Sequence, residues 1–330
     1  MSDDLLEGPT GYRDQPPRMG FFTDTSVCIG CKACEVACKE WNAVPDDGLS
    51  LLGMSYDNTG MLGADTWRHV AFIEQDKPLG RQQNAVAAMP AGPTATRQDA
   101  LVVAAGLGVK HGAELGSDTG SIQPGALAGQ PPAGGVTADG RTELRWLMAS
   151  DVCKHCTHAA CLDVCPTGAL MRTEFGTVVV QEDICNGCGY CVPACPYGVI
   201  DQRKDDGRVF KCTLCYDRLG AGQEPACAKA CPTESIQYGV LDELRERAKQ
   251  RVSNLHDAGV AEARLYGADP DDGVGGAGAF FLLLDEPETY GFPPDPVVTT
   301  RDLPRTWKHT ALAAAGVAAT VVAAFWGGRR

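Results

Sequence analysis

The chain has 330 residues, of which 44% are apolar and 22% are charged, so it can form one large folded domain or two ordinary ones. The net charge of −13 argues against a nucleic-acid-binding protein, whose contact surface would be basic. The first residues contain neither a basic segment before an apolar run nor a twin-arginine pair, so we expect no export signal in them. Disulfides explain the sixteen cysteines poorly, because disulfide-rich chains are typically small and secreted.

The first part of the chain contains one cysteine run, one predicted strand and one long insertion. Run one comprises Cys28, Cys31, Cys34 and Cys38. Thr66–Glu74 alternates apolar and polar residues, which predicts a strand. Residues 78–140 are rich in Ala, Gly, Pro and Gln, and a loop of this length is uncommon inside a compact domain. We interpret this segment as an insertion that either contacts a partner or is simply solvated.

Three further cysteine runs follow, and no cysteine of the chain lies outside a run. Runs two, three and four comprise Cys153, Cys156, Cys161 and Cys165; Cys185, Cys188, Cys191 and Cys195; and Cys212, Cys215, Cys227 and Cys231. A proline follows the last cysteine of each of these three runs. Between runs two and three, Thr177–Asp183 is rich in β-branched residues and follows the turn signal Phe175-Gly176, which predicts a strand.

The spacing of run three, with its terminal Cys-Pro, is typical of bacterial two-cluster ferredoxins. Three closely spaced thiolates bind three corners of a 4Fe–4S cubane, and the fourth cysteine starts a helix and ligates the other cluster of the pair. Zinc is the alternative metal, although zinc sites usually combine two cysteine pairs or cysteine with histidine. His155 and His158 lie within run two, so a mixed ligand set is a second alternative. Each run already supplies four thiols, and we expect both histidines to surround the site without ligating it.

Runs two and three are separated by a single predicted strand and should form one two-cluster unit, which leaves runs one and four to form the other. Exchange of the fourth cysteine within each pair predicts four ligand sets, with iron as the only metal. The sets are Cys28, Cys31, Cys34 and Cys231; Cys38, Cys212, Cys215 and Cys227; Cys153, Cys156, Cys161 and Cys195; and Cys165, Cys185, Cys188 and Cys191.

After run four, the pattern predicts a helix, a buried strand and a proline-rich connector. Apolar residues recur at helical spacing from Leu241 to Leu255, and Gly259 follows as the expected C-cap. The charged residues between them predict a solvated helix face. Phe280–Leu284 reads FFLLL and predicts a buried strand, and the prolines begin soon after it.

The last segment predicts a transmembrane helix. Thr310–Gly328 contains no charged residue, and a spanning helix needs roughly 17–25 apolar residues. Trp307 and Trp326 flank the segment as interfacial aromatic residues would. A buried helix of a soluble protein is the alternative, because alanine is only weakly hydrophobic. Basic residues lie on both sides of the segment, so its charges do not determine its orientation.

The sequences of Cys28–Asn42, Cys185–Val199 and Lys211–Ile236 resemble the iron–sulfur beta subunits of membrane-bound respiratory formate dehydrogenases. The resemblance extends to the connector and the C-terminal helix and leaves out residues 78–140. In relatives similar to nitrate reductase, tryptophan replaces the second cysteine of the third run and gives a three-iron cluster. Cys188 stands at that position here, which favours four cubanes.

The resemblance implies a subunit without an active site of its own that transfers electrons through four 4Fe–4S clusters. It implies three partners: a molybdopterin catalytic alpha subunit that oxidises formate, a membrane cytochrome b or similar quinone-reducing gamma subunit, and the lipid bilayer. In this family the alpha subunit carries the twin-arginine signal for export. The resemblance therefore implies that this chain is a single-pass membrane protein with its clusters on the extracytoplasmic side. Clusters on the cytoplasmic side are the alternative. A beta subunit of another molybdopterin oxidoreductase or of a hydrogenase is the alternative.

Together these observations predict an α+β protein with two ferredoxin-like two-cluster units, loop-rich insertions and one C-terminal transmembrane helix. The expected parts are residues 20–45 with 205–260 for runs one and four, 141–204 for runs two and three, the insertion 78–140, the proline-rich connector 285–305 and the transmembrane helix 307–327.

Overall fold

The structure is a computed structural model that describes residues 16–48, 56–57, 59–75 and 145–327. The chain divides into two units, Met1–Ile73 with Trp146–Arg330 and Glu74–Arg145. Apart from the last two residues of β2 and the first residue of β3, every element given below belongs to the first unit. The insertion predicted at 78–140 lies outside the described residues.

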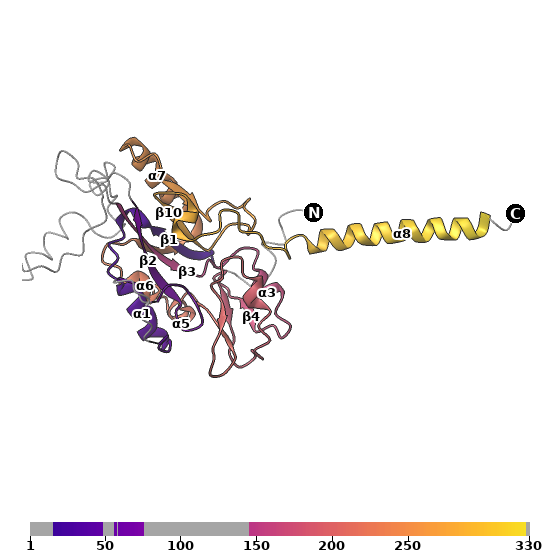
Figure 1. Cartoon of the computed structure of the whole chain (residues 1–330), viewed down its shortest axis with the longest axis horizontal. Helices are drawn as coiled ribbons and strands as arrows, with labels where there is room; N and C mark the ends of the chain where they lie inside the picture. The colour runs from indigo at the N-terminus through magenta and orange to yellow at the C-terminus, as the bar shows by residue number, and fades with distance from the viewer. Residues whose placement is uncertain (1–15, 49–55, 58, 76–144, 328–330) are drawn as a thin grey trace, which may run out of the picture. The chain divides into compact units, whose positions relative to one another are not determined.

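The largest sheet given for the described residues has four strands in the order β8-β1-β10-β9, and Figure 1 labels β1 and β10 beside α7. β1 (Met19–Asp24) runs parallel to β10 (Ala279–Leu283) and antiparallel to β8 (Ile236–Val240), and β9 (Arg264–Tyr266) pairs antiparallel with β10. All residues of β10 are buried, which explains why its sequence is apolar throughout and does not alternate. The strand predicted at Phe280–Leu284 is confirmed, displaced by one residue.

The long helix α7 (Leu241–Asp257) packs against β1 and β8. Its buried side chains include Leu241, Leu244 and Leu255, which share one face at helical spacing. Gly259 adopts a φ of +86° and donates its N–H to the carbonyl of His256 at 2.9 Å, which ends the helix. The helix and its glycine cap are therefore confirmed.

A buried ion pair connects α7 with the end of β1, and nothing in the sequence pattern indicated it. Arg251 Nε donates to Asp24 Oδ2 at 2.9 Å, and the side chains of the two residues are 3% and 5% exposed. Arg251 Nη2 also donates to Ser26 Oγ at 3.0 Å. Because Asp24 and Ser26 directly precede run one, this pair holds the chain in place just before the first cysteines.

Asp24→Ala should lower the free energy of unfolding by about 3–5 kcal/mol, because it removes the carboxylate that faces a buried guanidinium. Asp242→Ala is the matched control, since Asp242 pairs with Arg245 at 3.2 Å while its own side chain is 87% exposed. We expect the control to change the stability by at most about 1 kcal/mol. Unfolding in urea, followed by circular dichroism, measures both values, and equal effects of the two variants would contradict the prediction.

Three two-stranded sheets complete the β structure: β2 (Arg68–Gln75) with β3 (Arg145–Val152), β4 (Leu170–Arg172) with β5 (Val178–Val180), and β6 (Asp201–Gln202) with β7 (Val209–Phe210). β2 confirms the strand predicted at Thr66–Glu74. β5 is shorter than the predicted Thr177–Asp183, because Gln181 begins a turn in which its carbonyl accepts the N–H groups of Ile184 and Cys185.

Short helices carry five of the sixteen cysteines, namely Cys34, Cys38, Cys161, Cys191 and Cys227. The α-helices are α1 (Ala33–Asn42), α3 (Ala160–Asp163), α4 (Cys191–Ala194), α5 (Tyr216–Gly220) and α6 (Ala226–Lys229), and the 3-10 helices are η2 (Thr25–Val27) and η5 (Pro287–Tyr290). α1 contacts α6, and α3 contacts α4. The fold therefore mixes helices and strands, as predicted.

The C-terminal helix α8 (Leu303–Gly327) is confirmed, and it begins earlier than the predicted 307. Helix formation from Leu303 is possible because proline is tolerated in the first turn, where its missing N–H would have no helical partner. Within the described residues, Arg305–Trp326 is one helix that is long and apolar enough to cross a membrane, with a mean hydropathy of 1.5. Its side chains are exposed along the whole length, so it contributes nothing to the core.

Candidate metal centres

The four cysteine runs share a left-handed residue two positions after their first cysteine. In runs one and three this residue is Gly30 (φ +64°) or Gly187 (φ +71°), and in runs two and four it is His155 (φ +45°) or Leu214 (φ +57°). Glycine adopts this conformation without steric strain, whereas other residues pay roughly 1–2 kcal/mol. The bend curls each loop, so that its closely spaced thiols can face a common centre.

Gly187→Ala should disrupt the loop of run three far more than Gly198→Ala disrupts the turn that follows it. Both glycines are left-handed, with φ values of +71° and +62°, so each alanine incurs about 1–2 kcal/mol of backbone strain. A Cβ on Gly187 would also lie 2.5 Å from the backbone oxygen of Gly207, whereas nothing lies within 4 Å of one on Gly198. We expect loss of iron from the Gly187 variant alone, measured by iron analysis of the purified proteins. Equal iron content in both would contradict this.

The turns after the last cysteine are alike in runs two, three and four. The N–H groups of Gly168, Gly198 and Glu234 bond to the carbonyls of Cys165, Cys195 and Cys231 at 3.4, 3.3 and 3.3 Å. The intervening proline fixes its own φ and supports this turn. Run one lacks the proline, and its last cysteine instead lies within α1.

Site A contains the first predicted set. Its four cysteines, Cys28, Cys31, Cys34 and Cys231, line one cavity. Residues of β2, β3 and β8 line the same cavity. Burial, and then the charges of the neighbouring Cys34, Cys231 and Cys31, raises the pKa of Cys28 to about 11. Residues from opposite ends of the sequence thus meet here, because β1 and β8 pair and bring runs one and four together.

Site B contains the second predicted set, Cys38, Cys212, Cys215 and Cys227. Burial, and then the charges of Cys212, Cys227 and Cys215, raises the pKa of Cys38 well above its ordinary value. The side-chain amide of Asn42, one turn further along α1, lies 3.8 Å from Cys38 Sγ and 3.7 Å from Cys215 Sγ.

Site C contains the third predicted set around a small cavity. Its lining thiols are Cys153, Cys156, Cys161 and Cys195, and Lys154, His155 and Lys211 line the same cavity. Burial, and then the charges of Cys153, Cys195 and Cys161, raises the pKa of Cys156 well above its ordinary value.

Site D contains the fourth predicted set, Cys165, Cys185, Cys188 and Cys191. Burial, and then the charges of Cys165, Cys188 and Cys185, raises the pKa of Cys191 to about 11. Burial alone would also raise the pKa of Cys165, but backbone N–H groups and the hydroxyl of Thr167 together lower it. The structure therefore brings together the members of all four predicted sets.

The residues present fit iron–sulfur clusters. Thiols buried side by side resist ionisation, and a bound metal cation supplies the charge that makes them thiolates. Among the described residues, no three His, Cys, Asp or Glu side chains converge on a point suited to a single metal ion. The thiolates of a cubane bind separate iron atoms and need not converge so closely.

The two histidines of run two occupy different environments. His155 is 2% exposed, and its Nδ1 accepts the N–H of Val178 at 3.1 Å, so the proton of the neutral ring lies on Nε2. Burial, and then the charge of Lys211, holds its pKa well below the ordinary value. His158 is half-buried and lies beside Gly275. His155 lines the cavity of site C together with the four thiols, whereas His158 is not among its lining residues, and the expectation that neither histidine is a ligand stays a prediction.

Three buried cations near the thiols were not predicted. Lys154 and Lys211 line site C, with Lys154 Nζ 4.6 Å from the ring centre of Phe281, and Arg68 lies beside sites A and B. Lys154 and Lys211 are direct sequence neighbours of cysteines, which is a signal that could have pointed to them. Arg68 begins an alternating strand far from any run and gives no such signal.

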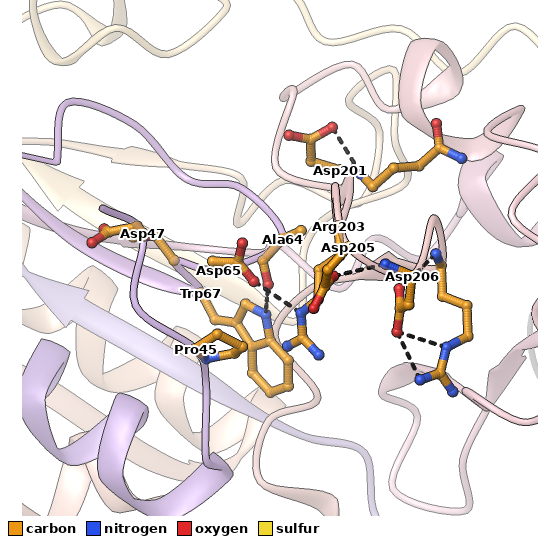
Figure 2. Close-up of polar contacts among 12 residues, drawn as sticks. Pro45, Asp47, Ala64, Asp65, Trp67, Asp201, Arg203, Asp205 and Asp206 are labelled. Atoms are coloured by element: carbon orange, nitrogen blue, oxygen red, sulfur yellow. Dashed lines mark hydrogen bonds and ion pairs between the residues drawn. The ribbon is translucent and has the colours of Figure 1, made fainter. Parts of the chain in front are cut away.

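Polar contacts tie the loop before β2 to the hairpin of β6 and β7 (Figure 2). Arg203 Nε donates to Asp65 Oδ1 at 2.8 Å, and Trp67 Nε1 donates to the carbonyl of Ala64 at 2.7 Å. Gln202 Nε2 donates to the carbonyl of Gly187 at 2.6 Å. The hairpin thus holds the loop of run three on one side and the segment after run one on the other.

The fold and the thiol sets define a ferredoxin-type iron–sulfur protein. Residues 144–241 match the family model of a 4Fe-4S dicluster domain, and residues 25–41 match that of a 4Fe-4S binding domain.

Relatives identify the family more closely. The chain is 35% identical over 318 residues to the formate dehydrogenase, nitrate-inducible, iron-sulfur subunit of Escherichia coli, covering 94% of this chain and 85% of that protein. It is 34% identical over 311 residues to the formate dehydrogenase iron-sulfur subunit of Haemophilus influenzae, covering 93% and 78%. It is 28% identical over 228 residues to one polypeptide of the anaerobic dimethyl sulfoxide reductase of E. coli, covering 69% and 76%. The chain therefore belongs to the family of formate dehydrogenase iron–sulfur subunits, as its motifs indicated.

Proposed function

We propose that this chain carries four 4Fe–4S clusters at sites A to D and transfers electrons from a formate-oxidising catalytic subunit to a membrane subunit. This proposal is supported by two cavities that are each lined by four cysteines, at sites A and C, and by the mutual effects of the thiols of sites B and D on one another's pKa. Each bound cubane supplies a one-electron site, with a potential that proteins set between roughly −700 and +450 mV. The chain's own residues hold these sites and bury all four thiols of site B.

Short helices connect the sites in pairs. α1 contains Cys34 of site A and Cys38 of site B, four residues and therefore about 6 Å apart along the helix axis. α6 begins just before Cys227 of site B and ends just before Cys231 of site A. α3 and α4 connect sites C and D in the same way. This exchange of helices supports the proposal of two ferredoxin-like units.

Thiols of different sites that lie close together indicate that the four sites follow one another in the order A, B, C and D. Burial raises the pKa of Cys34 of site A to about 11, and the charge of Cys227 of site B adds to this rise. Burial, and then the charge of Cys153 of site C, raises the pKa of Cys212 of site B to about 12. The charge of Cys191 of site D acts on Cys161 of site C.

The two ends of this order reach the surface. Among the sixteen cysteines, Cys31 of site A and Cys188 of site D are exposed, and the others are buried or half-buried. Sites A and D are therefore the places where electrons enter and leave in this proposal, and the partner subunits would cover them. Sites B and C lie between them.

The proposed partners are a catalytic subunit with molybdopterin and a cytochrome b or similar quinone-reducing subunit in the membrane. The family and the exposed apolar helix α8 support this assignment. We further propose that the clusters lie on the extracytoplasmic side, with Arg329 and Arg330 in the cytoplasm. A fluorescent protein fused after Arg330 should then fluoresce, whereas an active alkaline phosphatase fusion would place the C-terminus outside.

Formate should reduce the clusters when the complex is purified anaerobically from detergent-solubilised membranes. Bleaching of the visible absorbance and the appearance of several interacting electron paramagnetic resonance (EPR) signals measure this reduction. Reduction by dithionite but not by formate would retain the cofactors and refute the proposed donor. Absence of any 4Fe–4S signal in the iron-loaded complex would refute the cofactors themselves.

A further inference from the structure

Arg68 is a buried cation at the start of β2. It is 2% exposed, and its guanidinium lies 5.1 Å from the ring centre of Phe21. Nη1 donates to the carbonyl of Ser150 at 3.2 Å and to Ser150 Oγ at 3.0 Å. Nε and Nη2 are buried and form no hydrogen bond to a nitrogen or oxygen atom of the described residues, whereas the Arg68 side chain hydrogen-bonds to the thiol of Cys227.

The groups that do surround Arg68 are the thiols of two different sites. Burial alone would lower its pKa, but Cys227, Cys34, Cys212 and Cys38 together raise it above the ordinary value. Cys34 belongs to site A, and the other three belong to site B. The arginine also reaches site A through Ser150, whose hydroxyl lies 3.2 Å from Cys34 Sγ.

A buried charge without a counter-ion is strongly destabilising, and arginine cannot escape this cost by losing its proton. The fold must therefore supply negative charge near Arg68 in the functional protein. Sites A and B supply it when they are filled, because each then contains four thiolates.

We propose that Arg68 is the shared counter-ion of sites A and B and raises the reduction potentials of both. This inference rests on the ligand sets of the proposed function. Reduction adds one negative charge to a site, so a fixed cation next to it stabilises the reduced form more than the oxidised form. One guanidinium between two sites acts on both, whereas Ser150 and Phe21, its hydrogen-bond and ring contacts named above, belong to neither site C nor site D.

The test is a redox titration of the purified complex with mediators and dithionite, followed by EPR. Arg68→Met removes the charge at similar volume and should shift the midpoint potentials of sites A and B to lower values, leaving those of C and D unchanged. Loss of the same components in Cys31→Ala and Cys215→Ala assigns them to A and B. Arg264→Met is the control: Arg264 pairs with Glu286, and neither residue adjoins a cysteine run, so its loss should shift no potential.

Two further variants keep the test decisive. Arg68→Lys keeps the charge, so at site A or site B it should reverse most of the shift in midpoint potential that Arg68→Met causes. A shift caused by lost packing alone would not be reversed in this way. If Arg68→Met does not load its iron, Ser150→Ala is read instead, and it should lower the potential of site A alone. Unchanged potentials in Arg68→Met would overturn the proposal. If Arg68→Met does not bind iron, unchanged potentials in Ser150→Ala would overturn it instead. An equal shift at all four sites would also overturn it. Because the titration uses no formate, a wrong donor and a wrong role for Arg68 give different results.

Discussion

Replacing Cys38 by alanine is expected to eliminate the cluster at site B, whose three other ligands lie in run four, and to leave the cluster of its own run intact. The reason is the direction of α1, which carries Cys38 away from Cys34 and into contact with the thiols of Cys212 and Cys227. A cubane that loses one thiolate either dissociates or loses an iron atom, so one of the four 4Fe–4S signals should disappear. Mössbauer spectroscopy of iron-57-labelled protein counts the remaining cubanes.

Double variants make this test specific. Cys38→Ala combined with Cys215→Ala should lose no more cubanes than either single variant, because both residues ligate site B. Cys38→Ala combined with Cys31→Ala should lose two cubanes, because these residues belong to different sites. Effects at independent sites add, whereas effects within one site do not. The opposite pattern would show that run one holds its own cluster with all four of its cysteines, and the exchange of ligands would be wrong.

The grouping of the thiols could be predicted from the sequence because it depends on local rules. The spacing of each run sets which thiols lie in one loop, and the helix after the third cysteine carries the fourth one away. The structure brings the predicted members together at all four sites, while ligation itself stays a prediction. The left-handed residue of each loop was visible in the sequence at Gly30 and Gly187 but hidden at His155 and Leu214, where tertiary contacts impose the same conformation on other residue types.

Other features depend on contacts that a local pattern does not encode. Arg68 looks like the polar member of an alternating strand, and only the packing of β2 against β3 and the thiols makes it a buried cation. Arg251 lies among charged residues of α7, yet it is buried because β1 ends in Asp24 beneath it. The predicted strand of Thr177–Asp183 was too long because a turn at Gln181 competes with strand pairing.

Deleting residues 303–330 should release the protein from the membrane without loss of iron, when it is produced without partner subunits. All sixteen cysteines precede this segment, and α8 is exposed along its whole apolar length. Removing the helix therefore exposes no core residue of the described structure, while it removes the span that the bilayer would solvate. Carbonate extraction of membranes, with iron analysis of the released protein, measures both effects.

The matched control for this deletion keeps the helix and changes its polarity. Val317→Arg with Val321→Arg places two charges near the middle of the span, and each should oppose insertion by about 2.5–3.5 kcal/mol. We expect the double variant to behave like the deletion, whereas Val317→Leu with Val321→Leu should stay in the membrane. If the shortened protein remained bound to membranes that contain no partner subunit, the described body itself would bind lipid. If it lost its iron, α8 would instead support the metal centres, which its full exposure argues against.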